Sequence, residues 1–362
     1  MVSREDADVR LACPDVGAEE AAAVADVLAT GHLTMGPKVQ EFEGELARAC
    51  GVEHVVAVSS GTAALHLAVL ALGIGPGDEV LVPAYTFPAT ANVVALVGGR
   101  PVLVDIDADS FNIDPELAAV AVGPRTKAIV PVHLFGRPAR LDDLPAVTVL
   151  EDAAGALGAR RQGRPCGGLG NAGCLSFHPR KIVTTGEGGA VTTNDPELAE
   201  RVRSYRHHGW SPSDRYDDMP SGAFNYRLSD ILCAVGIPQV RRLEELLARR
   251  EEIAAGYRER LSELPGVLLP SADRGDRHGW QAYVIQLDRR DEAMARLRAD
   301  GIQCQIGTYA LHRLSAYRDQ GRFPGADACF ERALALPLHS RLTETDLDRV
   351  AELLAAHMEG SS

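Results

Sequence analysis

Short apolar runs separated by long connecting segments fill the part of this 362-residue chain between about residues 15 and 160. Each run is long enough for a buried strand, and each connecting segment is long enough for a helix. Strands and helices that alternate in this way form βαβ units, which build parallel sheets. The sequence therefore predicts an α/β domain with a mostly parallel central sheet. The predicted strands are Val55–Val58, Glu79–Val82, Pro101–Val104, Ala128–Val132 and Val147–Leu150.

The sequence pattern changes near residue 240. From Arg241 to Leu261, apolar residues recur at helical spacing with charged residues between them, which predicts one long amphipathic helix. We expect a large domain over residues 1–240 and a small α+β domain over residues 241–362, with the N-terminal segment packed either in the large domain or with the small one. The small domain is predicted to contain a strand at Gln281–Leu287 and helices at Asp291–Ala299 and Thr343–Met358.

The charge and the hydropathy of the chain exclude several classes of function. The net charge of −13 would repel nucleic acids and anionic membranes, so we expect neither as a partner. No stretch reaches 18 uninterrupted apolar residues, and residues 1–10 are too charged for a signal peptide. We therefore expect a cytoplasmic protein.

The cysteines are scattered along the chain and show no metal-binding spacing. There is no Cys-x-x-Cys pair and no histidine cluster, so we expect reduced, mostly buried thiols and no metal site. A single catalytic cysteine is left open by the sequence. The seven positions are Cys13, Cys50, Cys166, Cys174, Cys233, Cys304 and Cys329.

Lysine is rare in this chain. Lys181 is one of only three lysines, with Lys38 and Lys127, and arginine carries almost all of the positive charge. A guanidinium stays protonated, whereas a lysine amine can lose its proton when it is desolvated and can then attack a carbonyl. A lysine in such an arginine-rich chain therefore indicates a Schiff-base residue.

An acid precedes this lysine at the end of a predicted strand. Asp152 lies just after the run Val147–Leu150 and is followed by small residues. Alone, Asp152 could equally be a helix N-cap or a surface acid. Together with Lys181 it matches the requirements of pyridoxal phosphate (PLP), because an acid that keeps a proton on the ring nitrogen allows the cofactor to absorb the electrons of a carbanion.

A run of small residues at Ser59–Leu65 follows the first predicted strand and begins a helix. Backbone N–H groups and the positive end of the helix dipole can bind a phosphate there, and Thr62 adds a hydroxyl. An ordinary capped helix explains the same residues, since Ser and Thr are common N-caps. This segment is neither a Walker motif, because no Gly-Lys-Ser/Thr follows, nor Gly-x-Gly-x-x-Gly, which disfavours nucleotide triphosphates.

Together with these segments, several further motifs occur in a fixed order over nearly the whole chain. They occur in the order Gly31–Pro37, Ser59–Leu65, Pro83–Asn92, Val104–Asp107, Pro131–Gly136, Glu151–Ala154, Ser176–Gly189, Phe224–Asp230 and Leu336–His339. In this order they resemble the DegT/StrS-type sugar aminotransferases. This is a fold-type-I PLP-dependent family that acts on nucleotide-linked keto sugars and related cyclitols.

The resemblance assigns the reactive residues. It implies that Lys181 forms the Schiff base with PLP and, once released by substrate, moves a proton between the amino-bearing carbon and the cofactor. It implies that Asp152 pairs with the pyridine nitrogen and that Phe87 stacks on the ring face. From the residues alone, an aromatic after a strand end is also consistent with plain core packing.

The resemblance also assigns the phosphate ligands. It implies that Gly61, Thr62, the amide of Ala63 and Ser176 hold the phosphate of PLP. It further implies that Asn225 reaches this phosphate from the neighbouring subunit. We therefore expect a homodimer with shared active sites.

Three weaker candidates for substrate contact are His178, Glu187 and Tyr309, although a histidine before proline is also consistent with loop packing. Two positions depart from the family pattern. Gly155 stands where the family usually has glutamine or histidine near the cofactor, and His32 replaces a usual tryptophan. Either the cofactor pocket differs or a neighbouring residue compensates.

We expect a PLP-dependent aminotransferase that moves an amino group from an amino acid, glutamate or glutamine, to a keto group of a nucleotide-linked deoxysugar. Related deoxysugar dehydratases replace the lysine with histidine, so Lys181 disfavours dehydration. The alternatives are a PLP-binding regulatory protein without turnover, a cyclitol aminotransferase, and an unrelated dinucleotide-binding enzyme on a similar sheet.

Overall fold

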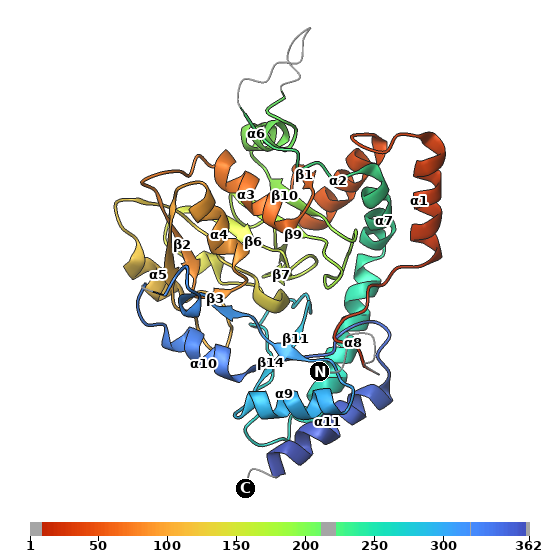
Figure 1. The fold of residues 1–362 in the computed structure, drawn as a ribbon, viewed down its shortest axis with the longest axis vertical. Coiled ribbons are helices and arrows are strands. Elements are labelled where there is room, and N and C mark those ends of the chain that lie inside the picture. The colour runs from red at the N-terminus through yellow and green to blue at the C-terminus, as the bar shows by residue number, and fades with distance from the viewer. Residues whose placement is uncertain (1–8, 211–221, 319, 360–362) are drawn as a thin grey trace.

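A seven-stranded sheet forms the centre of the computed structural model, which describes residues 9–210, 222–318 and 320–359 (Figure 1). β10 runs antiparallel to both of its neighbours, and the other adjacent strands run parallel. The fold is therefore α/β with a mostly parallel central sheet, as predicted. In spatial order the strands are β1 (His54–Val58), β10 (Gly189–Thr193), β9 (Ala172–Ser176), β6 (Thr148–Asp152), β5 (Thr126–Ile129), β2 (Glu79–Pro83) and β4 (Arg100–Val104).

All five predicted runs form strands of this sheet, but some of their ends differ. The run at Val147–Leu150 continues to Asp152 as β6, so Asp152 is the last strand residue and does not follow the strand. The run at Ala128–Val132 ends earlier, at Ile129. β9 and β10 were not predicted at all.

The two missed strands are rich in small residues for a physical reason. A β-carbon on Gly173 in β9 would lie 2.6 Å from the backbone oxygen of Gly167, and one on Gly189 in β10 would lie 2.4 Å from the backbone oxygen of Ser60. Only glycine permits these close backbone approaches. The glycines interrupt the apolar pattern that would otherwise identify a strand.

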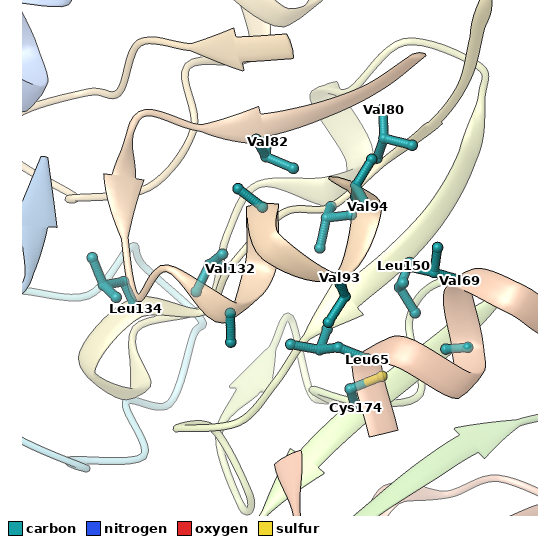
Figure 2. Close-up of a cluster of buried hydrophobic side chains, with 14 of the residues drawn as sticks. Leu65, Val69, Val80, Val82, Val93, Val94, Val132, Leu134, Leu150 and Cys174 are labelled. Carbon is teal, nitrogen blue, oxygen red and sulfur yellow. The ribbon is translucent and has the colours of Figure 1, made fainter. Parts of the chain in front are cut away.

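Alternate side chains of the sheet enter two separate cores. In β1, Val56 and Val58 belong to the core under α3 and α4, whereas Val55 and Ala57 belong to the core under α2 and α7. Figure 2 shows the first core, where Leu65 of α3 packs close to Val93 of α4. The helices of this part are α1 (Ala18–Thr30), α2 (Pro37–Cys50), α3 (Gly61–Ala71), α4 (Ala89–Leu96), α5 (Pro115–Ala121), α6 (Pro196–Arg206) and α7 (Asp230–Arg241).

A smaller three-stranded antiparallel sheet lies at the other end of the molecule, below the central sheet in Figure 1. Its strands are β11 (Tyr283–Gln286), β14 (Ala333–Leu336) and β12 (Gln305–Ile306). The helices beside it are α8 (Leu243–Leu261), α9 (Arg290–Ala299), α10 (Pro324–Arg332) and α11 (Glu344–Glu359). The long predicted helix is thus present as α8, beginning two residues later than expected. The domain limits themselves stay a prediction.

Short elements connect the two sheets. β13 (Tyr309–Ala310) pairs with β3 (Tyr85–Thr86), which follows β2 of the central sheet. The N-terminal segment reaches the smaller sheet's helices, because Val9 forms a bridge with Ile302. The remaining short elements are β7 (Arg160–Arg161), β8 (Arg164–Pro165) and the 3₁₀ turns Leu134–Gly136, Leu141–Asp143 and Leu311–Arg313.

The structure bears on two expectations drawn from composition. Each of the seven cysteines is a free thiol, and all except Cys13 are buried. Among the helices of the described residues, none combines the length and the apolar character needed to span a bilayer.

Candidate active site

The carboxyl ends of four strands meet at one edge of the central sheet. β1, β9, β6 and β2 all run in the same direction, so the residues at and after their ends gather there. Ligands of open α/β sheets bind at this kind of edge. The predicted residues Gly61, Phe87, Asp152, Ser176 and Lys181 all lie at the ends of these strands or just beyond them.

Asp152 is a buried carboxylate held by two hydrogen bonds. The hydroxyl of Thr90 donates to Oδ2 at 2.7 Å, and the backbone N–H of Ala154 donates to Oδ1 at 3.2 Å. Thr90 lies on α4, so this bond joins α4 to the end of β6. Thr90 is also within 3.2 Å of the backbone oxygen of Phe87, but it has one proton, and the charged acceptor makes the stronger bond.

Glu151, the residue before Asp152 in β6, holds the strand in place from the opposite face of the sheet. Successive residues of a strand point to opposite faces, so Glu151 points away from the face of Asp152. Glu151 is fully buried and accepts backbone N–H groups from Gly167 at 2.7 Å and Leu169 at 2.6 Å, and it pairs with His133 Nε2 at 2.8 Å. These bonds restrict β6 to one register and thereby set the direction of the Asp152 carboxylate.

Lys181 lies in a tight turn beyond the end of β9. Its backbone N–H donates to the backbone oxygen of His178 at 2.8 Å. Burial lowers the pKa of the Lys181 amine, the charge of Asp152 opposes this effect, and the charge of Arg180 adds to it. The acid and the amine predicted from sequence are therefore close enough for their charges to interact, and the amine is more easily deprotonated than that of an exposed lysine.

The start of α3 lies against the end of β9. A β-carbon on Gly61 would lie 2.8 Å from Cβ of Ser176 and 3.1 Å from its Oγ, so only glycine leaves space between them. Thr62 is exposed in the first helical turn, whose N–H groups have no partners within the helix. The amide of Ala63, expected to bind phosphate, instead donates to the N-cap Ser60 at 3.0 Å. The capped-helix interpretation thus describes Ala63, and the interpretation as an anion cradle describes the exposed first turn at Thr62.

Phe87 is not a core residue. Its side chain is 60% exposed, which excludes the alternative interpretation as core packing. The ring centroid lies 6.2 Å from that of Tyr309, which is itself 40% exposed and is brought there by the pairing of β13 with β3. Two aromatic side chains from distant parts of the chain therefore lie open at the same edge.

Two of the weaker candidates lie beside the lysine. Burial lowers the pKa of His178, Glu187 opposes this effect, and the charges of Lys181 and Arg180 add to it. These groups are close enough for their charges to interact. The ring Nδ1 of His178 accepts the backbone N–H of Arg180 at 3.2 Å, so His178 also has the loop-packing role.

Asn225 precedes Tyr226, whose backbone oxygen accepts the N–H of Ser59 at 2.8 Å, so its segment lies against the loop before α3. Its segment runs along the free edge of β1, where Arg227 bridges to Val58, and its side chain is exposed. No hydrogen bond within the described ranges links Asn225 to the other predicted residues.

The two departures from the family pattern differ in their surroundings. A β-carbon on Gly155 would lie 3.4 Å from both Cγ and Oε1 of Gln281, so the side chain of Gln281 occupies the space beside this glycine. His32 is exposed just before α2. Gln281 and Thr90 were not identified from sequence, because their contacts with this edge join residues more than 60 positions apart.

The comparison with known families decides the class of the protein. The model of the DegT/DnrJ/EryC1/StrS aminotransferase family matches residues 14–355. The chain belongs to this family. It is a PLP-dependent aminotransferase of fold type I, as the sequence predicted.

Individual relatives are similar to this chain over nearly their full length. The chain is 38% identical over 388 aligned residues to the spore coat polysaccharide biosynthesis protein SpsC of Bacillus subtilis (strain 168), and all of both chains is covered. It is 36% identical to the crystal structure of the aminotransferase TlmJ from Streptoalloteichus hindustanus, with a TM-score of 0.93 and coverage of 97% of this chain and 99% of that one. It is 34% identical to DesI, solved in the presence of its TDP-sugar product, with a TM-score of 0.90 and coverage of 97% and 93%.

The residues at the sheet edge fit PLP. The space between Gly61 and Ser176 would be filled by a single β-carbon, which is the tight approach that a phosphate cradle needs. The exposed ring of Phe87 offers a face for a planar ligand, and the Lys181 amine lies within the range of the charge of the Asp152 carboxylate. Within the described part of the chain, no group of three or more His, Cys, Asp or Glu is placed to hold a metal ion.

Proposed function

We propose that this aminotransferase moves an amino group from glutamate or glutamine to a keto group of a nucleotide-linked deoxysugar. The observation that carries this proposal is the Lys181 amine, whose pKa is lowered by burial and which lies within the range of the charge of the fixed Asp152 carboxylate. The names of the relatives support the substrate class, because SpsC takes part in polysaccharide biosynthesis and DesI was solved with a TDP-sugar product.

Each residue of the site has a role in this proposal. Bound PLP supplies an electron sink for the carbon that carries the amino group. Asp152 would hold the ring nitrogen, Phe87 the ring face, and the cradle between Gly61 and Ser176, with Thr62, the phosphate. Lys181 Nζ holds the cofactor until substrate arrives and then accepts or returns a proton, which requires the neutral amine that burial favours. Loss of hydration around this amine strengthens its interaction with Asp152.

The subunit arrangement is part of the proposal. We infer a homodimer in which Asn225 of one chain reaches the phosphate site of the other. The exposed position of Asn225 at the edge of β1, where it can be reached by a second chain, supports this arrangement. The exposed aromatic pair Phe87 and Tyr309 also favours a partner surface or ligand that covers it.

Two measurements test the proposal. Borohydride reduction of the purified holoenzyme, followed by peptide mapping, should place the pyridoxyl group on the Lys181 peptide alone. In a separate sample of unreduced holoenzyme, glutamate or glutamine should remove the absorbance band of the bound cofactor, and a nucleotide-linked keto sugar should restore it. A band that persists with every amino acid would favour the regulatory alternative, and an adduct elsewhere would refute the assignment of Lys181.

A further inference from the structure

Gln281 enters the active-site edge from the C-terminal part of the chain. It lies two residues before β11, and its backbone N–H donates to the backbone oxygen of Phe135 at 3.0 Å. The buried guanidinium of Arg250 donates to the backbone oxygen of Trp280 at 2.8 Å. A β-carbon on Gly136 would lie 2.9 Å from the backbone nitrogen of Trp280, so the two segments pack backbone to backbone. The backbone of Gln281 is therefore held in place independently of the contacts of its side chain.

The side chain of Gln281 bridges the segments that carry the acid and the amine. Its Cγ and Oε1 lie beside Gly155, three residues after Asp152. Its Nε2 donates to the backbone oxygen of Arg180, adjacent to Lys181, at 3.4 Å. One amide thus spans the gap between the end of β6 and the lysine turn.

Glycine at position 155 is what gives Gln281 this place. The backbone of Gly155 is not in the left-handed region, so strain does not explain the glycine. A β-carbon alone would make ordinary contact with Gln281, but a longer side chain at position 155 would compete with the amide for the same space. A glutamine or histidine side chain at position 155 would therefore compete with the side chain of Gln281 for this space.

We propose that Gln281 is a positioning residue for the cofactor site, where it holds the Lys181 turn against the strand end that carries Asp152 and replaces the side chain missing at Gly155. The amide group beside position 155 is then supplied by Gln281 from the C-terminal part of the chain and not by the loop after β6. This inference rests on Lys181 as the cofactor's amine and does not depend on which sugar is used.

The main test is Gln281→Met in the full-length holoenzyme, because methionine keeps the volume of glutamine but removes its donor and acceptor. We expect the dissociation constant for PLP to rise about five- to tenfold, the effect of losing one neutral hydrogen bond. We also expect the pH dependence of the cofactor absorbance to shift, since the turn that carries Lys181 is no longer fixed. Wild-type affinity and an unchanged pH profile in this variant would overturn the inference.

A rescue and a matched control make the test specific. The exchange Gly155→Gln with Gln281→Ala should bring PLP affinity back to within about threefold of wild type, because the amide returns to the same space. Gln305→Ala is the control, since Gln305 accepts from the side chain of Arg180 at 2.7 Å but does not touch the turn carbonyl, and it should retain wild-type affinity. A folded exchange variant that binds PLP no better than Gln281→Ala would contradict the shared position, and a wild-type enzyme without an adduct at Lys181 would overturn both this inference and the proposed function.

Discussion

At the scale of single residues, environment separates Lys181 from the other two lysines. Lys38 pairs with Glu41 at 2.7 Å, and Lys127 lies on the surface near Asp78, so both amines keep a charged or hydrated neighbour. Lys181 is desolvated next to one carboxylate and one guanidinium, and burial has the largest effect. The same residue type can therefore be a charged surface group or a desolvated amine within one chain.

Burial predicts how Lys181 titrates. Reductive ¹³C-methylation of the apoprotein should give three lysine signals, and the one absent from Lys181→Arg should lose its proton at a lower pH than an ordinary exposed lysine amine, because burial disfavours the charged amine. Since the folded pKa lies below the unfolded one, Lys181 binds fewer protons in the folded state, and its contribution to stability should increase as the pH rises between these values. A Lys181 signal that titrates at the pH of an ordinary exposed lysine amine would contradict this prediction.

The bond between Thr90 and Asp152 predicts a second residue effect. Thr90→Val removes the donor to a buried carboxylate and should lower the free energy of unfolding of the apoprotein by about 1–3 kcal/mol. The carboxylate also loses its orientation, so PLP should dissociate faster. Thr90→Ser keeps the hydroxyl and is the matched control in denaturant titrations. Equal unfolding curves for the two variants would show that this bond contributes nothing.

At the scale of helices and strands, runs of apolar residues identified the strands that no glycine interrupts. The five strands found from sequence consist mostly of apolar residues and contain no glycine, whereas β9 and β10 contain glycines required by close contacts such as that between Gly189 and Ser60. For the site, Lys181 and Asp152 follow from residue type and strand ends. Thr90 and Gln281 do not, because their partners become neighbours only when separate strands and loops assemble.

The contact between α3 and β9 gives a prediction at this scale. Gly61→Ala should push the start of α3 away from Ser176, at a cost of about 1–3 kcal/mol for overpacking. The displaced helix start should bind the phosphate less well. The preference for PLP over pyridoxal, which lacks the phosphate, should therefore decrease. Gly123→Ala is the control, because no atom lies within 4 Å of its β-carbon. An unchanged preference in Gly61→Ala would argue against a phosphate at this helix start.

At the scale of the whole molecule, the position of Asn225 determines what a complete active site is. The segment of Asn225 follows the outer edge of β1, which is the last strand of the central sheet, while Lys181 lies beyond β9, two strands further in. The exposed side chain of Asn225 is open to a second chain at this edge. A closed twofold dimer would let each chain supply Asn225 to the other's site.

Mixed dimers test this arrangement directly. Lys181→Ala should lower activity by at least about 10²–10⁴-fold, the range for removal of a general acid–base, and Asn225→Ala should weaken retention of PLP. If the sites are shared, a hybrid of these two chains has one site with both defects and one site with neither. Random mixing makes half of the dimers hybrid, so activity should return to roughly a quarter of wild type. If Asn225 acts within its own chain, every site in the mixture keeps one defect, and mixing should restore nothing.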